Sequence, residues 1–421
     1  MPPSPLQSPQ LAHLDDDDAQ ATTDCSDAPS PPTLKTRRSL PKQQNRFRSL
    51  KTRAISTVVL VGTFVGVIYL GHVPLMLMIF GIQYLMVNEL FKLATQAQQQ
   101  QQQQLRPDRR PAATSTFLQW YFFFVAAFWL YIRFVKKQLA VEITSNALLA
   151  HATGWILKGH TLISFSLYVA GFVGFVLKLR KKYYLQQFGQ YAWTHLILLF
   201  VFVPSSFFVS NIFDGIIWFL LPCSLVIIND IGAYLAGIFF GRTPLIKLSP
   251  KKTWEGFFGG LLITVLAAWA LAEYMSRFKW MVCPRTDLSM GWLECEPEPL
   301  FTRDRFAVRD LQWVVPHQVQ YILGRGVHML PRWLPSTPLQ PIPDFEFIAR
   351  PMQIHAIVLA MFASIIAPFG GFFASGFKRS FKIKDFGDSI PGHGGMTDRM
   401  DCQVVMAVFA YQWSIFMTQY Y

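Results

Sequence analysis

The feature that most constrains this chain is a series of long apolar runs separated by short, basic loops. Most runs hold roughly 18 to 22 residues, which is the length that an α-helix needs to cross the hydrocarbon core of a bilayer. The pattern predicts an all-α polytopic integral membrane protein with about nine transmembrane helices. The predicted spans are 54–70, 74–91, 116–134, 161–177, 192–209, 213–229, 255–275, 352–374 and 401–419.

Composition agrees with a membrane protein. Of the 421 residues, 52% are hydrophobic and 15% are charged, against roughly a quarter charged in an average soluble domain. The formal charge of +13 is compatible with nucleic-acid binding. However, Lys and Arg cluster beside the apolar runs, where positive charge fixes orientation in the membrane. We therefore expect membrane lipids and phosphorylated substrates as partners, and no nucleic acid.

The region before the first apolar run lacks the basic-then-apolar order of a cleavable signal peptide. Residues 1–53 are predicted to form a disordered, basic cytoplasmic tail, with eight Lys or Arg residues between Lys35 and Arg53. Such a cluster holds an N-terminus in the cytoplasm, although a merely solvated charge run has the same composition. Residues 54–421 are predicted to form one membrane-embedded domain.

Nine crossings place most later basic clusters on the cytoplasmic side, as the positive-inside rule requires. Lys136 and Lys137 fall on the opposite side, which questions the third and fourth spans. The sixth run is short enough to be tilted or broken.

Two loops stand out between the spans. The stretch from Gln96 to Gln104 is low-complexity and polar, so we expect a flexible loop insertion. The loop 276–351 is predicted to be lumenal, and its Cys283 and Cys295 either pair in an oxidising lumen or stay free. The five cysteines show no metal-type spacing.

A charged, glycine-rich segment from Ser375 to Asp401 carries the strongest chemical signal. Asp398 and Asp401 are three residues apart, so at the start of a helix they share one face and can converge on one cation. Carboxylate oxygens suit Mg²⁺, which takes one or two carboxylates and completes its shell with water and substrate phosphates. In the simpler alternative, the two Asp residues only complement the helix dipole.

The same segment offers groups that bind anions. Gly392, Gly394 and Gly395 allow the backbone to approach a ligand closely, and the helix that follows offers free N–H groups. Countercharge comes from Lys378, Arg379, Lys382 and Lys384. Basic residues after a transmembrane helix are otherwise topological anchors, but together with the glycines they predict a site for two phosphorylated reactants.

A second charged segment begins at Asp230. This residue ends an apolar run, and an ionisable group at such depth is a functional candidate. Lys251 and Lys252 lie near the start of the seventh predicted span, and Thr253 there is equally an ordinary N-cap. Glu89, inside the second span, is either a buried structural partner or part of the site.

These residues resemble the signature of the CDP-diacylglycerol synthases, or phosphatidate cytidylyltransferases. From Ser375 to Asp401 the chain follows the family pattern Ser-x2-Lys-Arg-x4-Lys-Asp-x-Gly-x2-Ile-Pro-Gly-His-Gly-Gly-x2-Asp-Arg-x-Asp. The block Ser-Pro-Lys-Lys-Thr-Trp-Glu-Gly at 249–256 is similar to a second family motif. Trp193-Thr194-His195, with 241–249, resembles the eukaryotic branch. The resemblance extends from about residue 45 to the C-terminus.

The resemblance implies a phosphatidate cytidylyltransferase that transfers CMP from CTP to phosphatidate, giving CDP-diacylglycerol and pyrophosphate for phospholipid synthesis. It also implies a Mg²⁺ requirement, possibly with a second cation, and a multi-pass protein of the endoplasmic reticulum membrane. The N-terminus and active site would be cytoplasmic, and a homodimer is expected.

Residue roles follow from the matched motif. The predicted catalytic residues are Asp385, Asp398 and Asp401, and the predicted substrate-binding residues are Lys251, Lys252, Lys378, Arg379, Lys384, His393 and Arg399. His393 is expected to pack or donate a hydrogen bond, because phosphatidate is already ionised and needs no base.

The metal centre departs from the family in one respect. Bacterial relatives carry a Gly-Asp-x2-Glu-Ser run whose Asp contributes to the metal centre, whereas this chain has Gly370 and Gly371 followed by Phe. Asp230 is the candidate replacement, so the predicted metal ligands are Asp398, Asp401 and Asp230.

Two other classes of membrane protein were compared with this pattern. A CDP-alcohol phosphotransferase needs an upstream Asp-Gly-x2-Ala-Arg run and two Asp residues four apart, which this segment lacks. A transporter with an ion path through Asp230 and Glu89 predicts related halves, and the sequence shows no internal repeat.

Overall fold

The computed structural model describes residues 42–105, 116–139, 147–249, 252–286, 291–307, 346–392 and 394–418. The chain divides into two units, 1–47 and 48–421, and the second contains every predicted site residue. Most of the predicted disordered tail lies outside the described residues. Residues 42–53 are helical, contrary to that prediction, because Lys, Arg and Gln are good helix formers and extend the first apolar helix.

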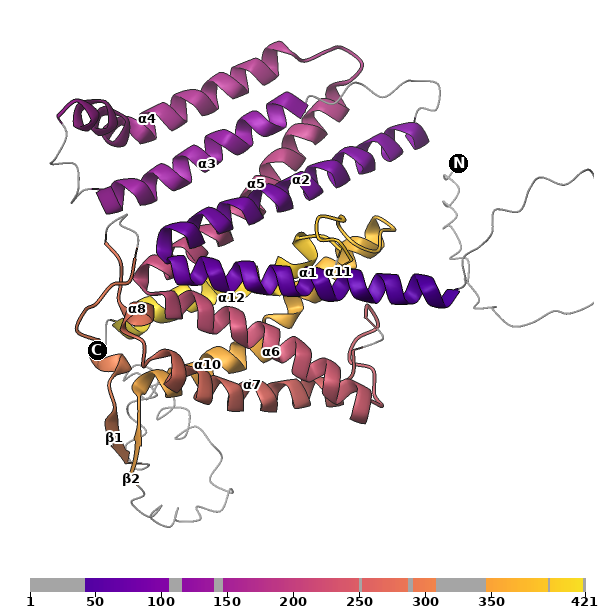
Figure 1. Cartoon of the computed structure of the whole chain (residues 1–421). Helices are drawn as coiled ribbons and strands as arrows, with labels where there is room; N and C mark the ends of the chain where they lie inside the picture. The colour runs from indigo at the N-terminus through magenta and orange to yellow at the C-terminus, as the bar shows by residue number, and fades with distance from the viewer. Residues whose placement is uncertain are drawn as a thin grey trace, which may run out of the picture. The chain divides into compact units, whose positions relative to one another are not determined.

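The described part of the chain is almost entirely helical (Figure 1). The helices are α1 (Lys42–Leu70), α2 (His72–Leu105), α3 (Thr116–Leu139), α4 (Ala147–Leu177), α5 (Tyr184–Asp214), α6 (Ile216–Phe240), α7 (Trp254–Met275), α8 (Lys279–Val282), η1 (Pro299–Phe301), α10 (Pro351–Ile365), α11 (Pro368–Ser380) and α12 (Thr397–Thr418). The strands are β1 (Asp304–Ala307) and β2 (Glu346–Ala349).

The helices confirm an all-α polytopic membrane protein. Within the described residues, eight segments are long and apolar enough to cross a membrane, and they coincide with the first eight predicted spans. α12 coincides with the ninth predicted span but is not one of these eight segments. Its first turns carry Asp398, Arg399 and Asp401, so the helix combines an apolar body with a polar start.

The break in a predicted span lies elsewhere than expected. α6 is 25 residues long, so the expectation of a short sixth span is wrong. The fifth and sixth apolar runs are instead two long helices that turn at Gly215, whose φ of 137° favours glycine. The eighth span is the interrupted one, because Pro368 cannot supply the N–H that would continue α10 into α11.

The Gln-rich stretch is also helical, contrary to the predicted flexible loop. α2 continues through Gln96 to Gln104 and ends at Leu105. Gln has a good helix propensity, and a preformed apolar helix removes the cost of nucleating a new one.

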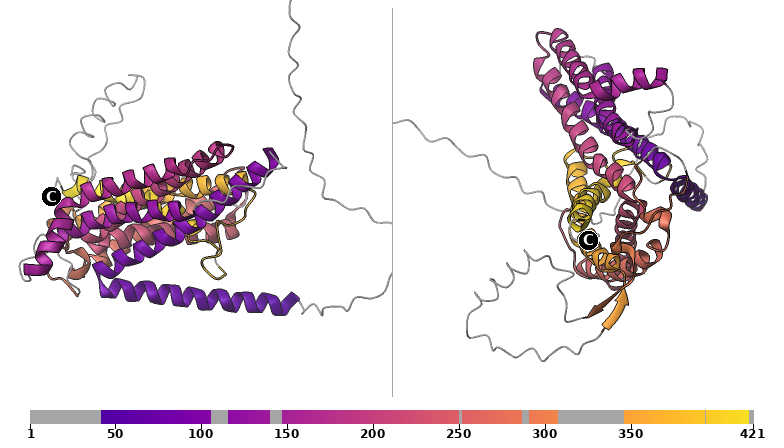
Figure 2. Two further views of the ribbon diagram at one scale, coloured as in Figure 1. Left: turned by 90° about the horizontal axis from the view of Figure 1, so that it is seen from above. Right: turned by 90° about the vertical axis from the view of Figure 1, so that its left-hand side faces the viewer.

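Two groups of helices meet at α12. Figure 1 shows α2, α3, α4 and α5 above α6, α7 and α10, and Figure 2 shows the same bundle from two other sides. α2 packs on α5 in the first group, and α7 packs on both α6 and α10 in the second. α12 contacts α5, α6 and α11. Its first turn, which carries the predicted site, therefore lies where the two groups join.

A disulfide and a pair of β-strands stabilise the segment that follows α7. Cys283 and Cys295 form a disulfide with their Cα atoms 5.8 Å apart, which resolves the alternative in favour of pairing. β1 and β2 pair antiparallel, with Asp304 opposite Ala349. The rest of the predicted long loop lies largely outside the described residues.

Candidate active site

Asp398 is held by three donors at the start of α12. Lys378 Nζ, from the last turn of α11, donates to Asp398 Oδ1 at 2.6 Å. The backbone N–H groups of Phe386 and Gly395 donate to Asp398 Oδ2 at 2.9 and 3.3 Å. The carboxylate thereby ties α11, the 381–396 loop and α12 together, and both of its oxygens already accept hydrogen bonds.

Glu89 also holds the start of α12 in place, a role that the sequence left open. Its side chain is buried in α2, and its two oxygens accept hydrogen bonds from Met396 N at 2.7 Å and Thr397 N at 2.9 Å. These N–H groups lie at the start of α12, where they lack intrahelical partners and where negative charge is favourable. Glu89 therefore belongs to the site as the residue that positions the start of α12.

Close packing around Glu89 requires glycine at one position. A Cβ on Gly395 would lie 2.8 Å from Glu89 Oε2, 2.9 Å from Gly387 N and 3.1 Å from Asp398 Oδ2. No side chain fits in that space without moving the two carboxylates. The Gly-Gly step of the motif is thus explained by contact with Glu89 and Asp398.

Asp401 lies one turn further along α12, beside Gly371. A Cβ on Gly371 would lie 3.4 Å from Asp401 Oδ2. The other oxygen, Oδ1, accepts a hydrogen bond from Cys402 N at 2.7 Å. Position 371 therefore faces the Asp401 carboxylate directly.

Asp230, from α6, is close enough to Asp401 for the two charges to interact. It interacts unfavourably with Asp401 and favourably with Lys252 and Arg399. Among the described residues, neither Asp230 nor Asp401 forms an ion pair within 4.0 Å. Asp230 is not at the end of its helix as the sequence suggested, because α6 continues to Phe240. Two carboxylates from different helices therefore interact here, and among the described residues neither has an ion-pair partner.

The second motif block leads into α7, which begins at Trp254. Thr253 accepts a hydrogen bond from Gly256 N at 3.2 Å, which confirms that it is the N-cap of α7. Glu255 accepts from Thr243 Oγ1 at 2.7 Å and from Arg242 N at 3.1 Å. The same block contains Lys252, whose Nζ lies 4.6 Å from the centre of the Phe372 ring on α11. Lys252 thus contacts α11, the helix that also carries Lys378.

Comparisons with known proteins identify the family of this chain. The family model described as "Cytidylyltransferase family" matches residues 51–416. The chain belongs to the cytidylyltransferase family.

Relatives within this family share most of their length with the chain. Phosphatidate cytidylyltransferase 1 of Arabidopsis thaliana is 50% identical over 372 residues, covering 88% of this chain and 80% of the relative. Phosphatidate cytidylyltransferase 1 of Mus musculus is 39% identical over 402 residues, covering 94% and 78%. The protein of the same name from Homo sapiens is 40% identical over 370 residues, covering 87% and 72%.

The remaining predicted residues of this cytidylyltransferase are mostly exposed where the structure describes them. Asp385 is exposed, with its carboxylate next to Gly394. The exposed basic residues are Lys252, Arg379, Lys384 and Arg399. Lys251 and His393 lie outside the described residues.

The donor set fits Mg²⁺ with two carboxylates rather than three. The described residues contain no group of three or more His, Cys, Asp or Glu residues arranged around one metal position. Asp230 on α6 and Asp401 on α12 supply hard oxygen donors from two different helices. Mg²⁺ typically needs only one or two carboxylates, because water and substrate phosphates complete its coordination. Ligation by Asp398, the third predicted ligand, would compete with Lys378 and two backbone donors.

Proposed function

We propose that this chain is a Mg²⁺-dependent phosphatidate cytidylyltransferase, which transfers CMP from CTP to phosphatidate and releases pyrophosphate. The observation that carries the proposal is the pair of carboxylates at Asp230 and Asp401, surrounded by basic side chains and set among membrane-spanning helices. The names of the relatives support the same reaction and the same two substrates.

In this reaction a phosphate oxygen of phosphatidate attacks the α-phosphorus of CTP. A new P–O bond forms, the bond to the β-phosphate oxygen breaks, and pyrophosphate leaves with its electron pair. No proton must be removed, because the attacking phosphate is already ionised. The protein's task is therefore to bring two polyanions together in line and to neutralise their charge.

The charged residues divide this task. Asp230 and Asp401 would hold Mg²⁺, with Asp398 adjacent, and a second cation is compatible with the substrate's charge. A Mg²⁺ ion held by these carboxylates would supply Lewis-acid chemistry and offset the charge that develops on the leaving group. Lys252, Arg379, Lys384 and Arg399 would bind phosphates together with Lys251 and His393. Asp385 would act from the rim, on substrate or metal.

Lys378 has two roles in this proposal. Its ion pair with Asp398 keeps the ammonium at the junction of α11 and α12, and the ammonium retains donors for a phosphate. Asp398 and Glu89 then act through the backbone, since they fix the loop and helix that present Lys378 and Asp401. The arrangement is held in place before substrate arrives, which favours electrostatic catalysis.

We further propose that the protein acts in the endoplasmic reticulum membrane, with its N-terminus and active site cytoplasmic, as a homodimer in phospholipid biosynthesis. Lys and Arg flank the site, as expected for a cytoplasmic face.

The test is direct product formation by the full chain purified in detergent. CTP labelled at the α-phosphate is mixed with phosphatidate and Mg²⁺, and the lipid phase is analysed for CDP-diacylglycerol. We expect labelled lipid with Mg²⁺ and none with excess chelator. Well-folded protein that yields no CDP-diacylglycerol contradicts the proposed function, and full activity in chelator contradicts the metal requirement.

A further inference from the structure

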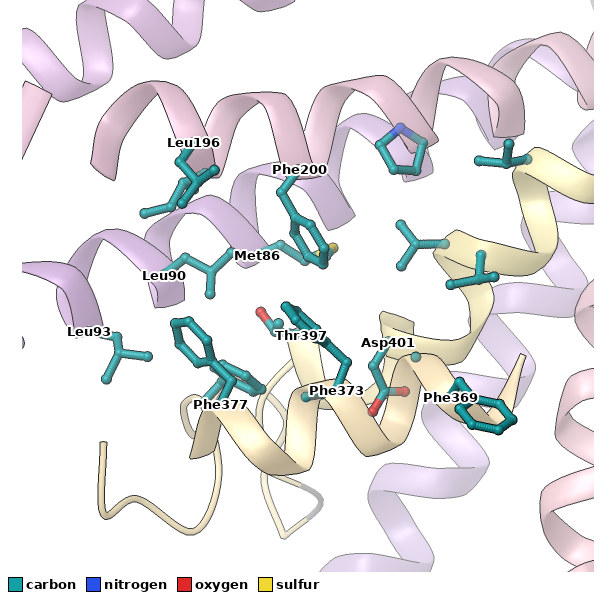
Figure 3. Close-up of a pocket in the computed structure, with 18 of the residues that line it drawn as sticks. Met86, Leu90, Leu93, Leu196, Phe200, Phe369, Phe373, Phe377, Thr397 and Asp401 are labelled. Carbon is teal, nitrogen blue, oxygen red and sulfur yellow. The ribbon is translucent and has the colours of Figure 1, made fainter. Parts of the chain in front are cut away.

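A cavity of about 800 Å³ lies between α2, α5, α10, α11 and α12. Figure 3 shows Phe200 and Met86 reaching into it from one side and Phe373 from the other. Its volume falls within the roughly 300 to 1,000 Å³ that is typical of small-molecule sites. The cavity is therefore large enough for a ligand, not only for a packing defect.

The lining of this cavity excludes a polar ligand. It contains no Lys or Arg, and its polar side chains besides the Trp193 indole are Thr397, Asp401 and Gln412. A nucleotide would find no countercharge there and would lose its hydration. A hydrocarbon chain would instead gain from burial, by about 0.8 kcal/mol for each methylene.

The exposed lining residues mark the mouth of the cavity, and they lie on membrane-spanning segments. Leu196 on α5 is 56% exposed, and Phe369 and Phe373 on α11 are 57% and 65% exposed. All three belong to segments long and apolar enough to span a bilayer. Exposed aromatic and aliphatic side chains at this depth meet lipid, so a membrane lipid reaches the cavity without crossing water.

The cavity also touches the candidate active site. Asp401 lies in its wall, and Figure 3 shows its carboxylate directed towards α11 rather than into the cavity. Phe386 lines the cavity, while its backbone N–H holds Asp398 and its ring lies 5.6 Å from Lys378 Nζ. An acyl chain in the cavity would therefore place its head group next to Lys378 and the carboxylates.

We infer that this cavity is an acyl groove, lined by Met86, Leu90, Phe200, Phe373, Val405 and Val408, which holds an acyl chain of the phosphatidate that reacts at the adjoining site. The inference rests on the proposed function and adds the location of the lipid's apolar part. It identifies the groove as the determinant of chain-length dependence, because each methylene buried contributes to binding of long-chain substrate only.

The test compares two substitutions on the same helix. Leu196→Trp fills the mouth of the groove, whereas Leu199→Trp places the same side chain at a position that is 65% exposed and outside the lining. Rates are measured with long-chain phosphatidate at fixed mole fraction in micelles, and with water-soluble dihexanoyl phosphatidate. For Leu196→Trp we expect kcat/KM to fall roughly tenfold or more with the long chain and less than about twofold with the short one. Leu199→Trp should resemble the wild type with both.

Equal losses with both substrates, or no loss with either, would overturn the acyl groove. A second measurement uses phosphatidate with a photoactivatable group near the end of one chain, which should label α2, α5, α11 or α12 and be displaced by unlabelled phosphatidate. Labelling of other helices contradicts the inference. Spontaneous cross-linking of Leu196→Cys between two copies also contradicts it, because the exposed side of the groove would then be a protein interface. An inactive wild type instead indicates failure of the proposed function.

Discussion

Acidic residues near the two ends of α7 differ in their pairing with cations. Near its last turn, Glu273 is bound by three arginines: Arg303 at 2.7 Å, Arg350 at 3.0 Å and Arg277 at 3.1 Å. In the half towards its start, Asp230 and Asp401 lie near one another without a direct cation partner among the described residues. The helix has 22 residues, so its ends are separated by about 33 Å.

This difference separates structure from function. A carboxylate that is fully paired contributes to holding elements together, and the Glu273 cluster joins α7 to the segment before β1 and to the start of α10. Carboxylates left close together and unpaired destabilise the fold unless a cation joins them. Repulsion between Asp230 and Asp401 thus lowers the stability of the fold where we propose that charged reactants bind. The Glu273 cluster stabilises the fold at the other end of α7.

The largest effect is expected from Asp401→Asn. Removing this charge should lower kcat at least about 100-fold, because a group that stabilises charge in the transition state is lost. The thermal unfolding midpoint should stay the same or rise, since the repulsion with Asp230 disappears. Initial rates and unfolding are measured side by side, with Asp388→Asn as the matched control, because Asp388 is an exposed Asp in the 381–396 loop that precedes α12. An Asp401→Asn variant that keeps wild-type activity refutes the assignment.

Glu89→Gln should have the next largest effect. The amide keeps one acceptor oxygen where the carboxylate used two, so the start of α12 shifts and kcat falls by about 10- to 100-fold. KM for CTP should change less than kcat, because Glu89 acts on the catalytic geometry. Gln83→Leu is the control, since Gln83 is also buried in α2 but bonds Tyr131 rather than α12. Equal damage from both variants would show a general packing effect.

At the opposite end, loss of the disulfide should affect stability alone. Replacing Cys283 and Cys295 by Ala removes a cross-link that spans 12 residues, which costs about 2 to 4 kcal/mol of unfolding free energy. The change is followed as a lower unfolding midpoint, with activity at low temperature unaltered. A strong loss of activity at low temperature would mean that this end also shapes the site.

The smallest effect is expected from Arg350→Ala. Arg350 is mostly buried and donates to Glu273, Ser276 and Phe301, so its loss should cost about 1 to 3 kcal/mol. Arg277→Ala provides the comparison within the same cluster, because Arg277 is 56% exposed and an exposed pair contributes less than about 1 kcal/mol. The thermal unfolding midpoint of Arg350→Ala should be well below that of Arg277→Ala. The reverse order would contradict the greater contribution that we assign to Arg350.

The spans are predictable from the sequence because hydrocarbon thickness sets their length, a constraint that acts locally on each run. The predictions for the Gln-rich stretch and for the interrupted span are wrong. The first depends on continuation of α2 as a helix, and the second on the single residue Pro368. Both outcomes depend on how one segment continues into the next, which composition does not report.

The candidate site was predictable only in part. The motif from Ser375 to Asp401 places Lys378 and Asp398 together, and the structure joins them at 2.6 Å. The role of Glu89 depends on contacts with residues more than 300 positions away along the chain. The sequence offered only one signal for it, an acid inside an apolar span. Tertiary packing decides such contacts, and no local pattern reveals their geometry.

We propose that Asp230 and Asp401 together hold Mg²⁺, and that Asp230 takes the place of the carboxylate that the family resemblance predicts at position 371. The most direct measurement is the Mg²⁺ concentration that gives half-maximal activity in the wild type and in Asp230→Asn, with Asp388→Asn in parallel. If Asp230 is a ligand, its amide variant should need about tenfold more Mg²⁺, while Asp388→Asn matches the wild type. An Asp230→Asn variant with unchanged rate and unchanged Mg²⁺ dependence would contradict the account.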